Sequence, residues 1–347
     1  MRLPQLSDFS FQDRKVLVRS DFDVPLRQAQ GKLMVEDDSR ILECLPTVEY
    51  LLEHNAKEII LMGHLGRPEG KVVGELSLKP VAEKLKELLN SKFKIQNSKF
   101  KCKIENFEAY LIDEKIILLE NIRFDSREEG NDLGFAKELA SLGDFYVNEA
   151  FAVSHREHAS IVGIPKFLPH CAGLHFVREA ESLSKVLENP KRPVVFVIGG
   201  AKPETKLPLI ADFARIADTV LVGGTLCQMP NVKCQMSNVK CARLTKDGFD
   251  IDEESIKRFS EIIQRAGTVV WNGPMGKYEE PGESKGTRKV GEAIANSNAL
   301  KIVGGGDTIA ALNKFGLVDK MDWVSTGGGA MLEFLAKGIL PGMKALL

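Results

Sequence analysis

Short apolar runs rich in β-branched residues alternate with amphipathic stretches along nearly the whole chain, and this alternation constrains the fold most. KVLVR (15–19) and EIILM (58–62) are predicted to be buried strands. Between and after them, ILECLPTVEYLLEH (41–54) and SLKPVAEKLKELLN (77–90) carry apolar residues at helical spacing. Parallel strands joined by crossover helices produce this pattern, so the sequence predicts an α/β architecture.

A chain of 347 residues is long enough for two domains, each with its own core. A third strand is expected in the first half, and four in the second: KIILLE (115–120), PVVFVI (193–198), DTVLV (218–222), TVVW (268–271) and ALKIV (299–303). ESLSKVLENPKRP (181–193) is predicted to be a charged helix that ends at a proline-bounded turn. We therefore expect two doubly wound, Rossmann-like parallel-sheet domains, residues 1–172 and 173–347, joined by a hinge helix.

The charge balance excludes a general polyanion binder. Lys and Arg number 47 against 48 Asp and Glu, a formal net charge of -1, so anion binding must come from local clusters and no nucleic-acid partner is expected. The first residues lack an apolar signal core, and no apolar run approaches membrane-spanning length. We expect a cytoplasmic protein with no membrane partner.

Six scattered cysteines favour a reducing compartment over a disulfide framework. Three of them, Cys227, Cys234 and Cys241, recur every seven residues because QMPNVKC (228–234) is followed at once by QMSNVKC (235–241). This spacing is not typical of zinc ligands. The duplication is predicted to be a surface loop with free thiols, and we assign it no function.

Basic and polar residues follow each predicted strand of the first half. They are Arg19, Asp21 and Asp23 in VRSDFDVP, His64 and Arg67 in GHLGRP, and Arg123 in ENIRF, to which DDSRI adds Arg40 and SHREH adds Arg156. Any one arginine alone is better explained by a surface ion pair. Because parallel strands end at one edge, several together predict a site for a small phosphorylated acid. Among the histidines of this half, only His64 is taken as a site residue.

Glycine-rich turns follow the strands of the second half, at GGAKPETK (199–206), GGT (223–225), GGGDT (304–308) and STGGGA (325–330). Where such a turn opens a helix, its free amides favour phosphate, and the first turn adds Lys202 and Lys206. Asp307 is suited either to a magnesium ion on nucleotide phosphates or to a helix N-cap. Neither GxxxxGK[ST] nor the dinucleotide fingerprint occurs.

Read in order, these motifs, with NEAFAVSHREHAS and WNGPMGKYE, resemble the phosphoglycerate kinase family over essentially the whole chain. The resemblance implies reversible transfer of the acyl phosphate of 1,3-bisphosphoglycerate to ADP, which gives 3-phosphoglycerate and ATP, with Mg²⁺ as cofactor. It also implies a glycolytic monomer whose two domains close to react, and it allows the extreme C-terminus to pack back on the first domain.

The resemblance also assigns roles to particular residues. The phosphoglycerate-binding positions are Asp21, Asp23, Arg40, His64, Arg67, Arg123 and Arg156. The nucleotide-binding positions are Lys202, Lys206, Asn272, Pro274, Glu279 at the ribose, Gly305, Gly306, Thr308 and Asp307, the last also the magnesium ligand. The positions implied to act on the moving phosphoryl group are Arg40, Lys202, Lys206, Gly327, Gly328 and Gly329.

The mechanism implied by the resemblance needs no general base, because the attacking carboxylate is already ionised at neutral pH. Catalysis is then positioning and charge neutralisation around the transferring group, with the largest single effect expected at Lys206 or Arg40.

Three departures from the family pattern stand out. Asp23 replaces Asn, and a carboxylate repels substrate oxygens that an amide can bind, so weaker substrate binding is expected. The chain after Gly224 is short where the family builds part of its adenine pocket. Thr205 and the pair Ala330-Met331 also differ from the common residues.

Two other functions remain as alternatives. A catalytically weakened relative that senses phosphoglycerate or nucleotide is disfavoured by the retained Arg40, Lys202, Lys206 and Asp307. A nicotinamide dehydrogenase built on two α/β domains is disfavoured by the missing dinucleotide fingerprint.

Overall fold

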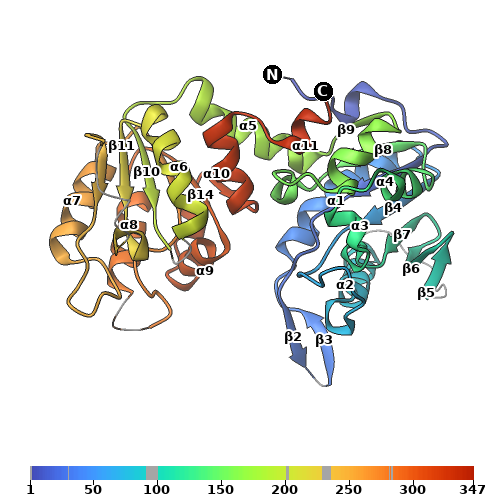
Figure 1. Ribbon diagram of the computed structural model, residues 1–347, viewed down its shortest axis with the longest axis horizontal. Coiled ribbons are helices and arrows are strands. Elements are labelled where there is room, and N and C mark those ends of the chain that lie inside the picture. The colour runs from blue at the N-terminus through green and yellow to red at the C-terminus, as the bar shows by residue number, and fades with distance from the viewer. Residues whose placement is uncertain are drawn as a thin grey trace. The chain divides into compact units, whose positions relative to one another are not determined.

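The computed structural model describes residues 2–29, 31–90, 101–200, 203–228, 236–280, 282 and 284–347 (Figure 1). The chain divides into two compact units: Met1–Glu179 with Leu340–Leu347, and Ala180–Ile339. The division falls inside helix α5 (Leu174–Glu188). Each unit contains one large sheet, and each is considered by itself below.

The sheet of the first unit has seven strands in the order β5-β6-β7-β4-β1-β8-β9. Five are parallel: β1 (Lys15–Arg19), β4 (Glu58–Met62), β7 (Ile116–Leu119), β8 (Phe145–Asn148) and β9 (His170–Ala172). The chain adds β4 and β7 on one side of β1, then returns to add β8 and β9 on the other. This reversal beside the first strand is the mark of a doubly wound sheet.

The three strands predicted in this unit are confirmed, and the sheet also has a part that the sequence did not predict. The hairpin of β5 (Lys101–Ile104) and β6 (Phe107–Asp113) continues the sheet antiparallel beyond β7. The other elements are the β2–β3 hairpin (Leu26–Ala29, Lys32–Val35), α1 (Ser39–Glu53), α2 (Lys79–Asn90), α3 (Ser126–Glu129), α4 (Leu133–Ala140) and α11 (Pro341–Lys344).

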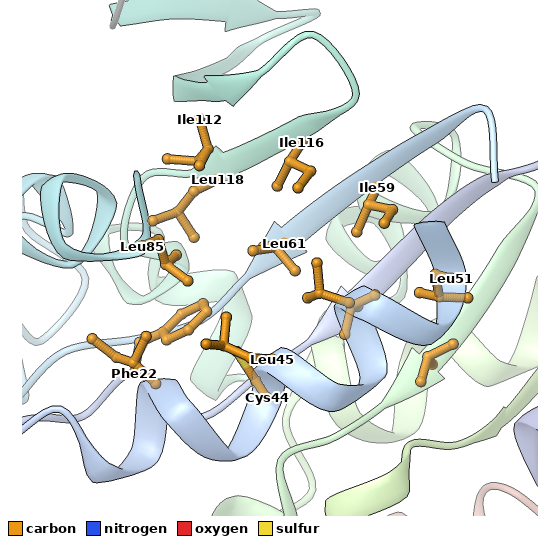
Figure 2. Close-up of a cluster of buried hydrophobic side chains, with 14 of the residues drawn as sticks. Phe22, Cys44, Leu45, Leu51, Ile59, Leu61, Leu85, Ile112, Ile116 and Leu118 are labelled. Carbon is orange, nitrogen blue, oxygen red and sulfur yellow. The ribbon is translucent and has the colours of Figure 1, made fainter. Parts of the chain in front are cut away.

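Helical spacing on α1 builds the core of this unit. Its side chains at Cys44, Leu45 and Leu51 face strand β4, where Ile59 and Leu61 alternate toward the helix (Figure 2). All five are at most 2% exposed. Full burial of an aliphatic side chain stabilises a fold by about 1.5–3 kcal/mol, so this contact fixes α1 and the residues at its first turn.

The sheet of the second unit is wholly parallel, in the order β12-β11-β10-β13-β14-β15. Counted along the chain this is 3-2-1-4-5-6, the order of nucleotide-binding doubly wound sheets. The four predicted strands are confirmed. The strands are β10 (Val194–Ile198), β11 (Thr219–Val222), β12 (Val239–Cys241), β13 (Thr268–Asn272), β14 (Leu300–Gly304) and β15 (Trp323–Ser325).

Helices cover both faces of this sheet. One face packs against α7 (Glu253–Gln264), α8 (Lys285–Ala295) and α9 (Gly306–Lys314). On the other, Phe196 of β10 stacks on Phe213 of α6 (Pro203–Ile216), with ring centroids 4.8 Å apart. The last helix of the unit is α10 (Gly328–Lys337). The prediction of an α/β fold with two parallel-sheet domains is therefore confirmed.

The duplicated heptads are only in part described, because Cys234 and the rest of 229–235 lie outside the described residues. The prediction of a surface loop is wrong for the end of the second heptad. Val239 is 5% exposed and pairs with Val220, so this segment forms strand β12. A lone Val-Lys-Cys run is too short to predict a strand from periodicity.

The described helices are short, with α1 and α5 reaching 15 residues each. None of those the structure describes combines the length and the apolar character needed to cross a bilayer.

Helix α5 begins on a buried carboxylate. Glu149 accepts hydrogen bonds from the amides of His175 (3.0 Å) and Phe176 (3.2 Å) and from the Thr47 hydroxyl of α1 (2.7 Å). These contacts satisfy amides at the helix start. Burial outweighs them and raises the pKa of Glu149 from 4.5 to about 7.

This raised pKa predicts a specific pH dependence of stability. Because the folded-state pKa lies above the unfolded value, Glu149 contributes stability that is present below about pH 4.5 and lost as pH rises through 7. Between pH 4.5 and 8, the wild type should lose about 3 kcal/mol of unfolding free energy relative to Glu149→Gln. Urea unfolding followed by circular dichroism at both pH values measures this difference, and parallel pH profiles for the two proteins would refute it.

Candidate functional site

The first candidate site lies where the sheet of the first unit reverses direction, between β1 and β8. In such sheets ligands bind at the carboxyl ends of the strands. β1 ends at Arg19, so Asp21 and Asp23 follow it at this edge. His64 follows β4, the neighbour of β1, and Arg123 lies in the turn after β7.

The two aspartates hold cationic and backbone donors in place. Asp21 accepts from an Arg40 NH group at 2.6 Å, and Arg40 is in the first turn of α1. This ion pair with Asp21 raises the pKa of Arg40. Asp23 accepts from the Gly66 amide at 2.8 Å and lies 3.8 Å from His64 Nε2. The loop after β4 is thus joined to the loop after β1.

His64 is buried, with 2% of its surface exposed. Its Nδ1 lies 3.2 Å from an NH2 group of Arg19. Burial, followed by the charges of Arg19, Arg123 and Arg40, lowers the pKa of His64 well below its usual value. The imidazole is therefore neutral at pH 7, and it contributes to this site as a hydrogen-bonding group and not as a cation.

Arg123 and Arg156 add charge to the same edge. Arg123 is 3% exposed and donates to the Gly66 carbonyl at 2.9 Å, while its Nε lies 3.3 Å from Glu129. Burial and then repulsion from Arg19 lower the pKa of Arg123 to about 10, and Arg156 adds to this repulsion. Like charges gathered at this density are stabilised by a bound anion.

Arg67 differs from the other arginines of the cluster. It directly follows Gly66 but is exposed, and among the described residues it makes no hydrogen bond or ion pair. The structure thus links six of the seven residues predicted to bind the acid, through direct contacts or through charge interactions: Asp21, Asp23, Arg40, His64, Arg123 and Arg156. The seventh, Arg67, follows Gly66 in the loop that Asp23 and Arg123 contact.

The second candidate site lies at the reversal in the second unit, between β10 and β13. Lys206, in the first turns of α6, donates to the Gly199 carbonyl at 2.6 Å and to the Asn272 carbonyl at 3.4 Å. The Gly200 amide donates to the Pro274 carbonyl at 2.8 Å. The Lys206 ammonium group is therefore held at the carboxyl ends of these two strands. Lys202, the other lysine predicted here, lies outside the described residues.

Two helix N-termini meet beside this lysine. Gly305 caps α9 with φ of 97°, and a Cβ at Gly328, the first residue of α10, would stand 2.5 Å from Gly305 Cα. Asn272 ties both turns together, because its Nδ2 donates to the carbonyls of Gly304 (2.9 Å) and Gly328 (3.4 Å). Adjacent helix N-termini combine free amides and dipoles and so favour phosphate. Gly306, Gly327 and Gly329 lie in the same two turns.

Thr308 has a more specific place than the sequence suggested. Its hydroxyl, fully buried in the first turn of α9, accepts from the Gly273 amide at 2.7 Å. The loop Gly273-Pro274 is therefore held against α9. The Thr308 hydroxyl is thus bonded to the backbone of this loop.

Asp307 and Glu279 both interact with Tyr278. Asp307 is exposed in the first turn of α9, and Glu279 is exposed in the loop after β13. After burial, the nearby carboxylates of Glu279 and Asp307 are the causes that raise the pKa of Tyr278. Lys314, at the end of α9, donates to the carbonyls of Tyr278 (2.8 Å) and Glu279 (3.0 Å). No group of three or more metal-ligating side chains occurs in the described part of the chain.

Two residues of these sites could not be selected from sequence. Arg19 appeared among the strand-end residues, yet nothing in the sequence indicated that its guanidinium is fully buried beneath His64. Lys314 lies 35 and 36 residues from the carbonyls that it holds. Lysines are common in the last turn of a helix because they interact favourably with the helix dipole. The sequence therefore provides no reason to select Lys314.

The chain was compared with known families and proteins. The family model described as phosphoglycerate kinase matches residues 6–240 and 229–337. The phosphoglycerate kinase of Borreliella afzelii (strain PKo) is 38% identical over 396 residues, covering 100% of both chains. That of Herpetosiphon aurantiacus is 39% identical over 395 residues, covering 100% of this chain and 99% of its own.

Solved structures of phosphoglycerate kinases are also similar to this chain. The phosphoglycerate kinase structure from Coxiella burnetii matches with a TM-score of 0.80 and 34% identity over 99% of each chain. That from Pyrococcus horikoshii OT3 also has a TM-score of 0.80, with 28% identity over 99% of this chain and 98% of its own.

The comparisons also locate a difference in length. The matched length of 396 residues exceeds the 347 residues of this chain by 49. The two segments of the family match overlap at 229–240, within the duplicated heptads. The interruption of the match therefore falls between β11 and α7, where the sequence predicted a shortfall.

Gly273 offers a direct test of the second site. It has φ of 95°, and an added Cβ would overlap the Gly199 carbonyl oxygen and Lys206 Nζ. We expect Gly273→Ala to lower the unfolding free energy by about 1–3 kcal/mol and to displace Lys206. Urea unfolding and MgADP titration measure both effects. Gly282→Ala, where a Cβ meets nothing within 4 Å, is the control, and equal behaviour of the two variants would contradict this geometry.

Proposed function

The chain belongs to the phosphoglycerate kinase family, and we propose that it performs that family's reaction with the two sites described above. Phosphoglycerate kinase activity follows from the family and from homology along the whole chain: the acyl phosphate of 1,3-bisphosphoglycerate passes reversibly to ADP, giving 3-phosphoglycerate and ATP. The observation that supports the assignment of sites is that each unit has, at the reversal point of its sheet, a cluster of groups suited to bind an anion.

The arginine cluster of the first unit is proposed to hold the phosphoglycerate. Its guanidinium groups offer planar, paired donors that suit both the carboxylate and the phosphate of this ligand. Arg40 stays charged through its pair with Asp21, and buried Arg123 lies in a repulsive field that an anion relieves. Exposed Arg67 is available to the ligand without breaking a contact within the described residues.

The glycine turns of the second unit are proposed to hold the nucleotide. Lys206, together with Lys202, neutralises phosphate charge, and the amides at Gly305 and Gly306 face phosphate oxygens. Glu279, in the loop that follows Asn272 and contains Pro274, is proposed to contact the ribose. The amides at Gly327, Gly328 and Gly329 are proposed to receive the transferring phosphoryl group.

Asp307 is the proposed protein ligand of magnesium. Its carboxylate is exposed in the first turn of α9, beside amides suited to phosphate, and Mg²⁺ is commonly bound by one or two carboxylates together with substrate phosphates. Bound there, Mg²⁺ would neutralise charge on the nucleotide phosphates. The residues present fit this arrangement, in which the nucleotide supplies the other ligands.

The proposed mechanism uses no general base. In the direction that consumes ATP the attacking group is a carboxylate, which is ionised at neutral pH. Arg40, Lys206 and the glycine amides at α10 stabilise charge on the equatorial phosphoryl oxygens. Because the arginines and the glycine turns belong to separate units, we propose that transfer requires domain closure, which also excludes water from the acyl phosphate. We further propose that the protein acts as a monomer.

A coupled assay of ATP consumption with 3-phosphoglycerate and Mg²⁺ tests this function. Turnover that depends on both substrates supports it. A folded protein that binds both ligands yet shows no turnover at saturation would instead support the alternative of a phosphoglycerate or nucleotide sensor.

Lys206 should carry a large part of the rate. Removing the amine in Lys206→Met leaves the phosphoryl charge less neutralised, and we expect kcat to fall by about 10²–10³-fold. Lys289→Met is the matched control, because Lys289 is exposed on α8 and pairs with Glu292. Steady-state kinetics of both variants provide the comparison, and wild-type kcat in Lys206→Met would exclude this role.

Asp23 should weaken substrate binding. One of its oxygens already accepts from the Gly66 amide, a bond that Asn can keep, while the other adds negative charge to an anion site. We expect Asp23→Asn to lower the KM for 3-phosphoglycerate about fivefold, as for ~1 kcal/mol of relieved repulsion, with the KM for ATP unchanged. Glu114→Gln, an exposed carboxylate elsewhere in the unit, is the control. An unchanged KM in Asp23→Asn would contradict the expectation.

A further inference from the structure

Arg19 is a fully buried charge beside the proposed phosphoglycerate site. It ends β1 with 0% of its surface exposed. Its Nε donates to the Ser160 hydroxyl at 2.9 Å, one NH group donates to the Ser20 carbonyl, and the other lies 3.2 Å from His64 Nδ1. With three partners inside the protein and no exposed surface, this guanidinium is held in place by the protein itself.

A buried acid completes the support of Arg19. Glu128, also 0% exposed, accepts from the Ser160 amide at 2.9 Å and from the Ser160 hydroxyl at 2.5 Å. The Ser160 hydroxyl therefore gives its proton to Glu128 and its lone pair to Arg19 Nε. This chain of bonds fixes the direction of every proton from Glu128 to Arg19, because a hydroxyl has one proton to donate.

The direction of the next bond follows from the chemistry of arginine. A guanidinium has five N–H donors and no acceptor, so His64 Nδ1 must accept from Arg19. A neutral imidazole with an accepting Nδ1 has its proton on Nε2. The charges that face His64, from Arg19, Arg40 and Arg123, together with His158, oppose a second proton.

We propose that Arg19 is a positioning residue that sets the tautomer of His64, so that Nε2 presents a proton at the anion site. This role of Arg19 rests on the proposed function, in which the carboxyl edge of the first unit's sheet binds phosphoglycerate. Substrate oxygens are acceptors, and in the other tautomer the Nε2 lone pair would face them and the Asp23 carboxylate 3.8 Å away. Arg19 thus makes a neutral histidine a donor among arginines without adding another cation.

The tautomer of His64 can be measured directly. Histidine-selective ¹⁵N labelling of the full chain gives two ring-nitrogen signals for each of the six histidines, and His64→Gln identifies the signals of His64. In the wild type at pH 7 without substrate, we expect Nε2 to be protonated and Nδ1 to be unprotonated. A wild-type His64 with its proton on Nδ1 would overturn the proposal without any variant at Arg19.

Variants at Arg19 then test whether this residue sets the tautomer of His64. Arg19→Met should release the tautomer preference and raise the KM for 3-phosphoglycerate about tenfold, the effect of one lost hydrogen bond of ~1.4 kcal/mol, with the KM for ATP unchanged. Arg19→Lys, which keeps a donor, should restore the Nε2 proton. Ser160→Ala removes a partner of Arg19 but not the bond to His64, so it should keep the wild-type tautomer.

Loss of fold is controlled separately. Because Arg19→Met leaves Glu128 buried without its charge partner, Arg19→Met with Glu128→Gln removes both charges, and Glu128→Gln alone is its reference. A folded double variant that keeps the Nε2 proton on His64 would overturn the role of Arg19. The ring-nitrogen signals are independent of turnover, so a failure of the proposed function would appear in the assay and leave the tautomer result intact.

Discussion

The structure depends on one topological constraint, the reversal of strand order beside the first parallel strand of each sheet. Between β1 and β8, and again between β10 and β13, successive crossovers leave in opposite directions, so the loops at the carboxyl ends separate and expose backbone. Apart from Lys314 at the end of α9, the described residues assigned to a site lie at one of these two edges or in the helix turn that follows. The apolar side chains of β1, β8, β10 and β13 are at most 1% exposed, and this burial fixes the positions of the strand ends and of the charged loops that follow them.

Much of this arrangement could be predicted from sequence, because its signals are local. Buried strands such as 15–19 and 268–271 are short apolar runs, and the residues after them necessarily lie at one edge of a parallel sheet. Elements with weak periodicity could not be predicted, among them β12 and the β5–β6 hairpin. Contacts between segments that are far apart in the sequence could not be predicted either. The buried position of Arg19 depends on Ser160, which lies 141 residues away, and no local pattern encodes that distance.

The shortened segment of the second unit leaves the sheet intact. The interruption of the family match at 229–240 falls after β11, yet β12 still pairs with β11 and the order 3-2-1-4-5-6 is complete. The reversal point between β10 and β13, with Lys206, Asn272 and the two helix N-termini, lies on the opposite side of β10 from this segment. Loss of chain at the edge of a sheet is compatible with an unchanged centre, because the phosphate-binding backbone is built from the central strands.

We propose that the acid and the nucleotide bind at two independent strand-end sites, one in each unit. Calorimetry with 3-phosphoglycerate and with MgADP, titrated separately into the wild type, Arg40→Met and Lys206→Met, tests it most directly. We expect Arg40→Met to weaken binding of the acid alone, by at least about tenfold, and Lys206→Met to weaken binding of the nucleotide alone by a similar factor. Two results would contradict this proposal: a folded single variant that loses binding of both ligands, or two variants that both bind each ligand as the wild type does.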